Sequence, residues 1–182
     1  MRKLVDNRYE IGQRLGRGSQ GSVYRARDIR PGHQGIEVAI KWYEGSASES
    51  ESFIKELQAE AQLIRELTHP NVCPVYDWGI SAEDDGEEDG AYIVMKLLLG
   101  GSLEDRLTSG VALNFKEALS IGIQVCEGLD YIHNRSNKTL VHNDIKPRNI
   151  LFDDQGSALI TDFGIAKPLA IDPLVPLTAA GE

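Results

Sequence analysis

The chain has 182 residues, of which 41% are hydrophobic and 26% are charged, a composition typical of an ordinary soluble globular protein. Its net charge of −9 argues against a general affinity for nucleic acid or for an anionic membrane surface. The apolar runs are too short for a membrane span, and no signal-peptide pattern opens the sequence. We therefore expect a cytoplasmic protein in which Cys73 and Cys126 are buried, reduced thiols.

The first third of the chain predicts three antiparallel strands, at 9–18, 22–29 and 35–43. A glycine cluster separates the first two strands, and the Pro and Gly residues of 30–35 indicate a turn before the third. These connections are too short to hold the crossover helices that parallel strands require. The pattern therefore favours a meander.

The next segment has the spacing of a helix, with apolar residues at Phe53, Leu57, Ile64 and Leu67. We expect it to end at the His-Pro-Asn sequence 69–71, because Pro70 disfavours helical geometry at His69. Glu60 lies within the apolar stripe, where a carboxylate costs free energy unless it is paired. The helix alone leaves two alternatives open: a paired glutamate, or a glutamate at the rim that turns to solvent.

Two further strands, at 74–80 and 91–99, complete an expected sheet of five strands. The glycines before Ser102 mark a boundary, so we expect one domain over 1–98 and a second over 99–182. Ser102 is a good N-cap for a short helix that follows it.

A longer helix is expected over 114–133, where Asn114 and Glu117 have the spacing of a capping box. We expect one set of its residues to face inward: Phe115, Leu119, Ile123, Cys126 and Leu129. The sequence Asp-Asp-Gln-Gly at 153–156 indicates a hairpin turn between two short apolar strands.

The segment Gly-Arg-Gly-Ser-Gln-Gly contains Gly16, Gly18 and Gly21, a spacing that lets backbone approach phosphate groups closely. Dinucleotide-binding folds use the same spacing but place a helix after the third glycine. Here the β-branched, alternating sequence 22–29 favours a strand instead. The segment is therefore a hairpin that covers a nucleotide or, alternatively, a purely structural glycine-rich hairpin.

Two later segments carry polar groups suited to phosphate chemistry. In 142–149, Asp144 can accept a proton, Lys146 can neutralise a phosphate, and Asn149 can offer an oxygen to a hard cation. In 162–164, Asp162 ends an apolar strand and a glycine follows. Alone, that tripeptide is common by chance, and a strand-ending turn explains it equally well.

Taken together, these motifs resemble the eukaryotic-type (Hanks-type) Ser/Thr protein kinase family, and phrases such as Asp-Phe-Gly-Ile-Ala-Lys look like its bacterial branch. The matching segments occur in the family's order: GxGxxGxV at 16–23, VAIK at 38–41, HPNV at 69–72, HxDIKPxN at 142–149 and DFG at 162–164. The resemblance implies an α+β, protein-kinase-like fold. Its N-lobe would be a five-stranded antiparallel sheet with one helix, and its C-lobe would be mainly helical and truncated.

The resemblance also implies roles for individual residues, with ATP and Mg²⁺ as cofactors. Lys41 would contact the α- and β-phosphates and pair with Glu60, which would account for the carboxylate in the helix stripe. Asp162 and Asn149 would hold Mg²⁺, Asp144 would be the base, and Lys146 would contact the γ-phosphate. A lysine at 146 implies Ser or Thr of a protein as the acceptor. The adenine site would comprise Leu15, Val23, Ala39 and Leu151, the gatekeeper Met95 and the hinge from Lys96 to Leu98, beneath Gly16, Gly18 and Gly21.

Two departures from the family pattern qualify these expectations. Asn143 stands where many relatives have an arginine that binds a phosphorylated activation loop, so activation by that route is in doubt. The sequence also lacks the Ala-Pro-Glu motif and the helices after it. We therefore expect a fragment that ends in the activation loop, is weakly active or inactive alone, and exposes apolar surface on helix 114–133. Self-association or a partner chain would cover that surface.

Two rival functions remain. One is a kinase-like small-molecule phosphotransferase, against which the full glycine loop, HPN and DFG argue. The other is a nucleotide-binding pseudokinase or scaffold that regulates a partner. In this chain every phosphate, metal and base position is filled, which argues against a lost active site but not against a lost substrate platform.

Overall fold

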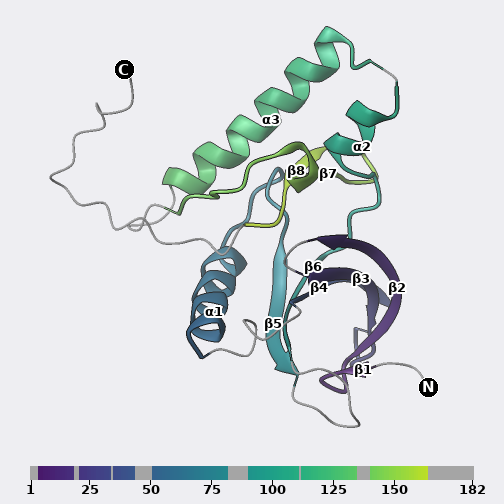
Figure 1. Ribbon diagram of the computed structural model, residues 1–182, viewed down its shortest axis with the longest axis vertical. Helices are drawn as coiled ribbons and strands as arrows, with labels where there is room; N and C mark the ends of the chain where they lie inside the picture. The colour runs from purple at the N-terminus through teal and green to yellow at the C-terminus, as the bar shows by residue number, and fades with distance from the viewer. Residues whose placement is uncertain are drawn as a thin grey trace, which may run out of the picture.

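The computed structural model describes residues 4–18, 21–33, 35–43, 51–81, 90–110, 112–134 and 140–163, without the side chains of Glu60 and Ser81. In these residues six strands form one antiparallel sheet in the order β1-β2-β3-β4-β6-β5. Their bounds are β1 Leu4–Val5, β2 Tyr9–Gly18, β3 Gly21–Asp28, β4 Ile36–Tyr43, β5 Val75–Ser81 and β6 Gly90–Lys96. Register shifts in β2 after Ile11 and Arg14 let this strand curl across the sheet (Figure 1).

Both faces of the central strand β4 are buried over 38–41, which explains the consecutive apolar residues at 38–40. Because side chains alternate along a strand, Val38 and Ile40 pack on one face with Tyr9, Tyr92 and Val94. Ala39 and Tyr43 pack on the opposite face with Leu57 of the helix α1 (Glu51–Arg65). Lys41 lies between Ala39 and Tyr43 in the alternation of the strand, so its side chain is on the face of the sheet that α1 covers and does not point to solvent.

The sheet has one strand more than the five expected from the sequence. The additional strand β1 pairs with the start of β2 through a tight turn in which Asp6 and Asn7 both have positive φ, 52° and 51°. Asp and Asn are the residues that tolerate this geometry best after glycine. A strand of two residues has no readable alternation, so periodicity could not reveal it.

A charged cluster fastens this N-terminal hairpin to the rest of the sheet. Asp28 is almost fully buried and accepts hydrogen bonds from Arg8 Nη2 at 3.1 Å and Arg30 Nη2 at 2.8 Å. Arg8 also pairs with Asp77 of β5. Burial by itself would raise the pKa of Asp28, but the hydrogen bonds from Arg30 and Arg8 outweigh it and lower that pKa to about 2.

We expect Asp28→Asn to lower the free energy of unfolding at pH 7 by about 2–3 kcal/mol, because it leaves two guanidinium groups without their shared anion. Since the pKa of Asp28 is depressed in the folded state, its contribution is present above the unfolded pKa of about 4. The contribution is lost as the pH falls through about 2. Urea denaturation at pH 7 and at steps below pH 4 measures both effects.

The exposed Asp154, in the turn after β7, is a matched control, since Asp154→Asn changes the same charge without touching this cluster. Wild-type protein and the control should lose stability more steeply than Asp28→Asn below pH 4. If the free energy of unfolding fell with pH equally in all three proteins, Asp28 would not be the source of this stabilisation.

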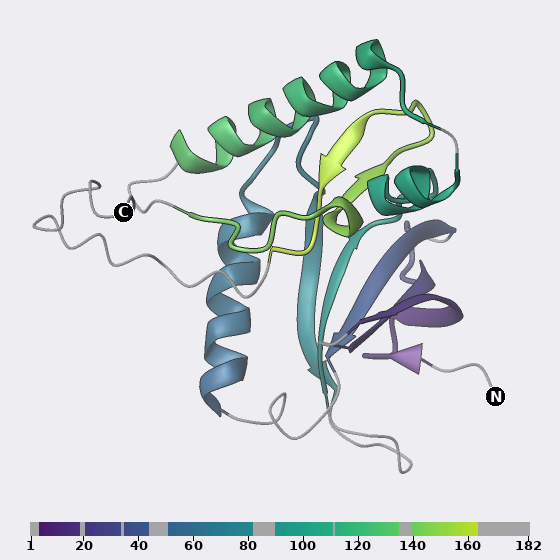
Figure 2. The same cartoon turned by 45° about the horizontal axis from the view of Figure 1, so that its top comes forward.

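The helix α1 lies along β5, as both views show (Figures 1 and 2). Its predicted stripe is confirmed for Leu57 and Ile64, which are buried. The helix ends at Arg65, four residues earlier than the expected stop at His69. Residues after the helix hydrogen-bond to β8 (Ala158–Ile160): Cys73 N donates to Ile160 O, and the Asn71 side chain donates to Ala158 O, both at 2.8 Å.

The remaining described residues form α2 (Leu103–Thr108), α3 (Phe115–Asn134), the short 3-10 helix η2 (Pro147–Asn149) and the hairpin β7 (Ile150–Phe152) and β8 (Ala158–Ile160). Both predicted N-caps are confirmed. Ser102 and Asp105 form a reciprocal capping box, and Asn114 and Glu117 exchange hydrogen bonds of 3.0 and 3.1 Å. These elements lie at one end of the sheet, where α3 packs on β8 (Figure 2).

The expected inward face of α3 is wrong for four of its five residues. Phe115, Leu119 and Ile123 are 83%, 52% and 49% exposed, and Cys126 is exposed too, so only Cys73 is the buried thiol that we expected. Only Leu129 of the five is packed against a core cluster. The buried α3 residues are instead Ile121, Gly128 and Ile132.

Gly128 is the physical reason for this orientation. A Cβ atom there would lie 2.9 Å from both Asn71 O and the Ile160 side chain. The helix therefore presents its glycine to β8 and to the segment after α1, which brings the two halves of the molecule together. In the described part of the chain, no helix combines the length and the apolar character needed to cross a membrane.

Candidate functional site

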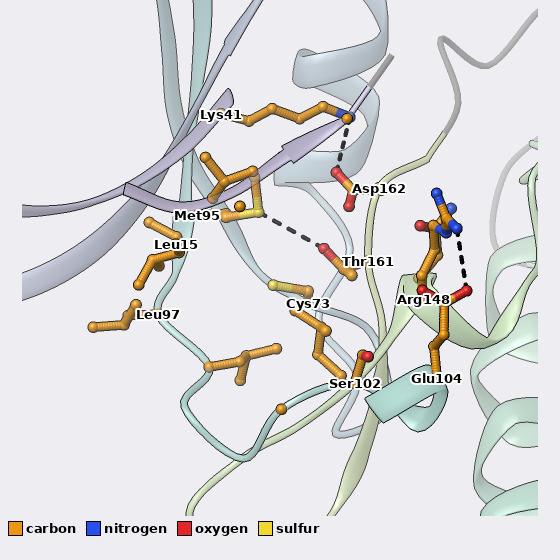
Figure 3. Close-up of a pocket in the computed structure, with 18 of the residues that line it drawn as sticks. Leu15, Lys41, Cys73, Met95, Leu97, Ser102, Glu104, Arg148, Thr161 and Asp162 are labelled. Atoms are coloured by element: carbon orange, nitrogen blue, oxygen red, sulfur yellow. Dashed lines mark hydrogen bonds and ion pairs between the residues drawn. The ribbon is translucent and has the colours of Figure 1, made fainter. Parts of the chain in front are cut away.

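A pocket of ≈ 1030 Å³ lies between the six-stranded sheet and the segment that carries η2, β7 and β8. This is at the upper end of the volumes typical of small-molecule sites. Figure 3 shows lining residues that come from distant parts of the chain. All but one of the site residues singled out from the sequence line it: Leu15, Gly16, Gly18, Gly21, Val23, Ala39, Lys41, Met95, Lys96, Leu98, Asp144, Lys146, Asn149, Leu151 and Asp162.

The exception is Glu60. Its backbone belongs to α1, but its side chain lies outside the described residues, so its predicted pairing with Lys41 stays a prediction. Gly164 and all residues after it are also outside the described residues.

Strand register sets the sheet side of the pocket. Val23 of β3 is opposite Lys41 of β4, and Ala39 of β4 is opposite Met95 of β6, so these four side chains share one face. Gly21, at the start of β3, has φ +139°, and a Cβ atom there would lie 1.8 Å from Trp42 O. Only glycine lets the backbone fold this closely onto β4, which holds the glycine segment over the pocket.

Lys41 is 8% exposed, and its Nζ donates to Asp162 Oδ1 at 2.9 Å (Figure 3). This ion pair joins β4 to the residue two positions after β8. A buried ammonium beside a carboxylate in a large pocket is a site suited to anions once the carboxylate is engaged elsewhere. The lysine in the apolar strand therefore lines the pocket and does not point to solvent.

Asp144, Lys146 and Asn149 form a second group across the pocket. Lys146 Nζ lies 2.7 Å from Asp144 Oδ2, and Asn149 Nδ2 donates to the same oxygen at 3.0 Å and to Asp144 O at 2.9 Å. The hydrogen bond from Lys146 is the largest cause that lowers the pKa of Asp144, and the bond from Asn149 adds to it. Asp144 is therefore ionised at neutral pH and can accept a proton.

Buried His142 hydrogen-bonds the backbone of this group and the backbone of Thr161. Its Nε2 donates to Thr161 O at 3.0 Å, and its Nδ1 accepts from Asp144 N at 3.3 Å. Burial lowers the pKa of His142, so the ring is neutral and this tautomer is maintained. The ring also packs on Phe163, with centroids 4.7 Å apart. His142 thus couples the backbone beside Asp144 to the backbone beside Asp162.

Two residues at the site have a left-handed backbone conformation, Asn143 with φ 59° and Asp162 with φ 56°. Such geometry costs free energy for residues other than glycine, and Asn and Asp tolerate it best. Strain of this kind concentrates at functional sites. Asn143, noted in the sequence only for its missing charge, thus suits the backbone geometry at the position before Asp144.

Some lining residues were missed by the sequence reasoning. Thr161 Oγ1 donates to Met95 Sδ at 3.7 Å, and Cys73 lies beside them (Figure 3). Burial raises the pKa of the Cys73 thiol to about 12, so this thiol stays protonated and unreactive. Elsewhere in the pocket lining, Arg148 Nη2 pairs with Glu104 Oε1 at 3.2 Å. No motif marks these residues, because contacts between distant segments place them.

The chain has oxygen ligands that suit Mg²⁺. Asp162 offers a carboxylate, and the two hydrogen bonds donated by Asn149 Nδ2 leave the carbonyl oxygen of this amide as its ligand atom. Magnesium prefers such hard oxygen donors and is bound with few protein ligands when phosphate groups supply the rest. Within the described residues no group of three or more His, Cys, Asp or Glu side chains forms a metal cage. The residues present therefore fit Mg²⁺ bound together with phosphate.

Comparison with known proteins agrees with the geometry. Residues 9–176 match the family model described as protein kinase domain. The chain is 38% identical to the serine/threonine-protein kinase PrkC of Bacillus subtilis, over 92% of the chain and 24% of that protein. It is 36% identical to the serine/threonine-protein kinase PknA of Mycobacterium tuberculosis, over 97% of the chain and 39% of that protein.

A probable LRR receptor-like serine/threonine-protein kinase of Arabidopsis thaliana is 35% identical over 92% of the chain and 14% of its own length. The chain thus spans between 14% and 39% of the length of these three relatives. The family model, in contrast, matches nearly the whole chain, from β2 into the residues after Asp162. The chain belongs to the protein kinase domain family.

Proposed function

We propose that the protein is a serine/threonine protein kinase that transfers the γ-phosphate of ATP, with Mg²⁺, to hydroxyl groups of protein substrates. One observation carries this proposal: Lys41, Asp162, Asp144, Lys146 and Asn149, from three separate segments, line a single pocket of nucleotide size. Family membership and the names of the relatives support it. In this proposal, residues 1–98 form the nucleotide-binding lobe and residues 99–182 part of the catalytic lobe.

The adenine would lie between the apolar side chains of Leu15, Val23, Ala39 and Leu151, with the backbone from Lys96 to Leu98 beside it. Lys41 would hold the α- and β-phosphates. Bound Mg²⁺ would neutralise phosphate charge, held by Asp162 and Asn149. The two oxygen ligands and the ammonium are then placed before the nucleotide arrives, which is the preorganisation that phosphoryl transfer requires.

Asp144 would orient the acceptor hydroxyl and accept its proton, since its lowered pKa keeps it ionised. Lys146 pairs with Asp144 here and is long enough to turn toward the γ-phosphate of a bound nucleotide. A lysine at this position supports Ser or Thr as the acceptor, as do the names of the relatives. The filled set of positions disfavours a pseudokinase.

The test is transfer of radiolabelled γ-phosphate to general protein substrates by the gene product that contains this chain, with and without Mg²⁺. We expect Mg²⁺-dependent labelling of Ser and Thr, identified by phosphoamino-acid analysis. Binding of Mg·ATP without any transfer would support the pseudokinase instead. Labelling of small molecules but not of proteins would support the small-molecule phosphotransferase.

We expect Asp162→Asn to weaken binding of Mg·ADP by about tenfold or more, where each factor of ten is ~1.4 kcal/mol. The substitution replaces the one carboxylate proposed as a Mg²⁺ ligand and keeps its shape. Calorimetric titration with ADP at several Mg²⁺ concentrations measures this effect, and adenosine is the control ligand because it carries no phosphate. An unchanged Mg²⁺ dependence would contradict the metal role.

A covering partner for α3 is a further part of the proposal. The exposed apolar side chains Phe115, Leu119 and Ile123 support it, because contiguous apolar surface is costly in water. Sedimentation velocity at several protein concentrations tests whether this surface drives self-association.

A further inference from the structure

Tyr43, at the end of β4, lies on the same face of the sheet as Lys41, because residues two apart in a strand point the same way. The Lys41 Nζ atom lies 5.2 Å from the centroid of the Tyr43 ring. This is within the range of about 6 Å over which a cation is attracted to an aromatic face. Tyr43 is 4% exposed, so little water weakens the contact.

The Tyr43 ring is itself held by α1. The ring of Phe53, in the first turn of that helix, meets it edge to face, with centroids 5.5 Å apart and an interplanar angle of 66°. Leu57, one turn further along, belongs to the same buried cluster. The packing of Phe53 on Tyr43 thus connects α1 to Lys41.

Lys41 and Tyr43 both line a cavity of only ≈ 20 Å³, together with Cys73 and Phe163 among others. That is space for about one water molecule. A smaller side chain at 43 would enlarge it and let water solvate the ammonium group. The ring therefore both attracts the ammonium and keeps competing solvent away from it.

We propose that Tyr43 is a positioning residue for Lys41, holding the ammonium in the pocket while Asp162 is engaged by Mg²⁺; this inference rests on the proposed function. In the structure Asp162 pairs with Lys41. In the proposed nucleotide complex, the Asp162 carboxylate is shared with the metal and its hold on Lys41 weakens. The face of an aromatic ring does not compete for phosphate or metal, so its hold persists.

The test compares the affinities for Mg·ADP and for adenosine, measured by calorimetry on the gene product that contains this chain. Since Lys41 is proposed to meet the phosphates and not the base, Tyr43→Leu should weaken Mg·ADP binding by about 3- to 10-fold, in the range of a buried cation–aromatic contact. Adenosine affinity should stay within about twofold of wild type. Tyr43→Phe keeps the ring face and should bind Mg·ADP as wild type does.

Two further variants separate this role from simple core packing. Tyr92→Leu removes another buried tyrosine from the opposite face of the sheet and should leave the ratio of the two affinities unchanged, whatever it does to the melting temperature. In a Lys41→Met background, Tyr43→Leu should have no further effect on Mg·ADP affinity, because the group that the ring positions is gone.

If Tyr43→Leu does not fold, Tyr43→Met answers the same question, since it fills the space without a ring. Three outcomes would each overturn the inference. The first is an equal loss of affinity for Mg·ADP and for adenosine in Tyr43→Leu, and the second is a Tyr43→Phe variant that binds Mg·ADP as weakly as Tyr43→Leu does. The third is an undiminished effect of Tyr43→Leu on Mg·ADP affinity in the Lys41→Met background. A wild-type protein that binds neither ligand would instead overturn the proposed function, so the two failures are distinguishable.

Discussion

Lys41→Met should lower the rate of phosphoryl transfer by about 100- to 1000-fold, the usual cost of removing one preorganised group that stabilises developing charge. The lysine is 8% exposed and lies in the pocket with its ammonium 2.9 Å from Asp162. Methionine keeps an unbranched apolar stem of similar length, so β4 and its packing should be maintained. Steady-state kinetics with a protein substrate, together with the melting temperature, measures both parts of this expectation.

The matched control is Lys55→Met. Lys55 is an exposed lysine of α1 whose Nζ pairs with Glu51 one turn away, so its replacement removes the same charge outside the pocket. That variant should transfer phosphate at the wild-type rate. Transfer by Lys41→Met at the rate of the control would show that Lys41 has no role in the chemistry.

Asp144→Asn should lower kcat by about 100- to 10,000-fold, the range attributed to general base catalysis, while KM for ATP changes little. Asn has the shape of Asp and can still meet Lys146 and Asn149, but it has no charge with which to accept a proton. The site is otherwise intact, because His142 bonds the backbone of residue 144 and not its side chain. The comparison of kcat with KM therefore isolates the proton transfer from nucleotide binding.

Asp154→Asn serves as the control for this variant also, since Asp154 is exposed and is not a pocket-lining residue. A kcat for Asp144→Asn within a fewfold of wild type would remove Asp144 as the base. An equal rise in KM for ATP would instead indicate that the substitution has disturbed the nucleotide site.

Local chemistry explains why many elements were predictable. The capping boxes at Ser102 and at Asn114 are interactions between residues three positions apart, so they are visible in the sequence itself. The same is true of the turn at 153–156 and of the glycine segment, whose glycines allow one backbone geometry that other residues resist. The predicted pocket residues were found because each motif carries its own chemistry.

The buried side of α3 was predicted wrongly because the sequence is compatible with burial of more than one side of this helix. The helix 115–134 has apolar residues on more than one side, and periodicity could not decide which side is buried. Close contact of Gly128 with Asn71 and Ile160 decided it, and this left Phe115, Leu119 and Ile123 exposed. Cys126 became exposed for the same reason.

The sequence by itself determined the order of the α-helices and of the strands after β1, the helix caps, and the set of polar groups available for phosphate chemistry, because these depend on neighbouring residues. Only the tertiary structure decided which of these groups meet. Lys41 and Asp162 are 121 residues apart and pair because curled strands and α1 bury one face of β4 beside the end of β8. Tyr43 shares the face of Lys41 because it lies two residues away in β4, and α1 supplies the Phe53 ring that packs on it. Such contacts follow from packing, in which the available space selects among faces of nearly equal hydrophobicity.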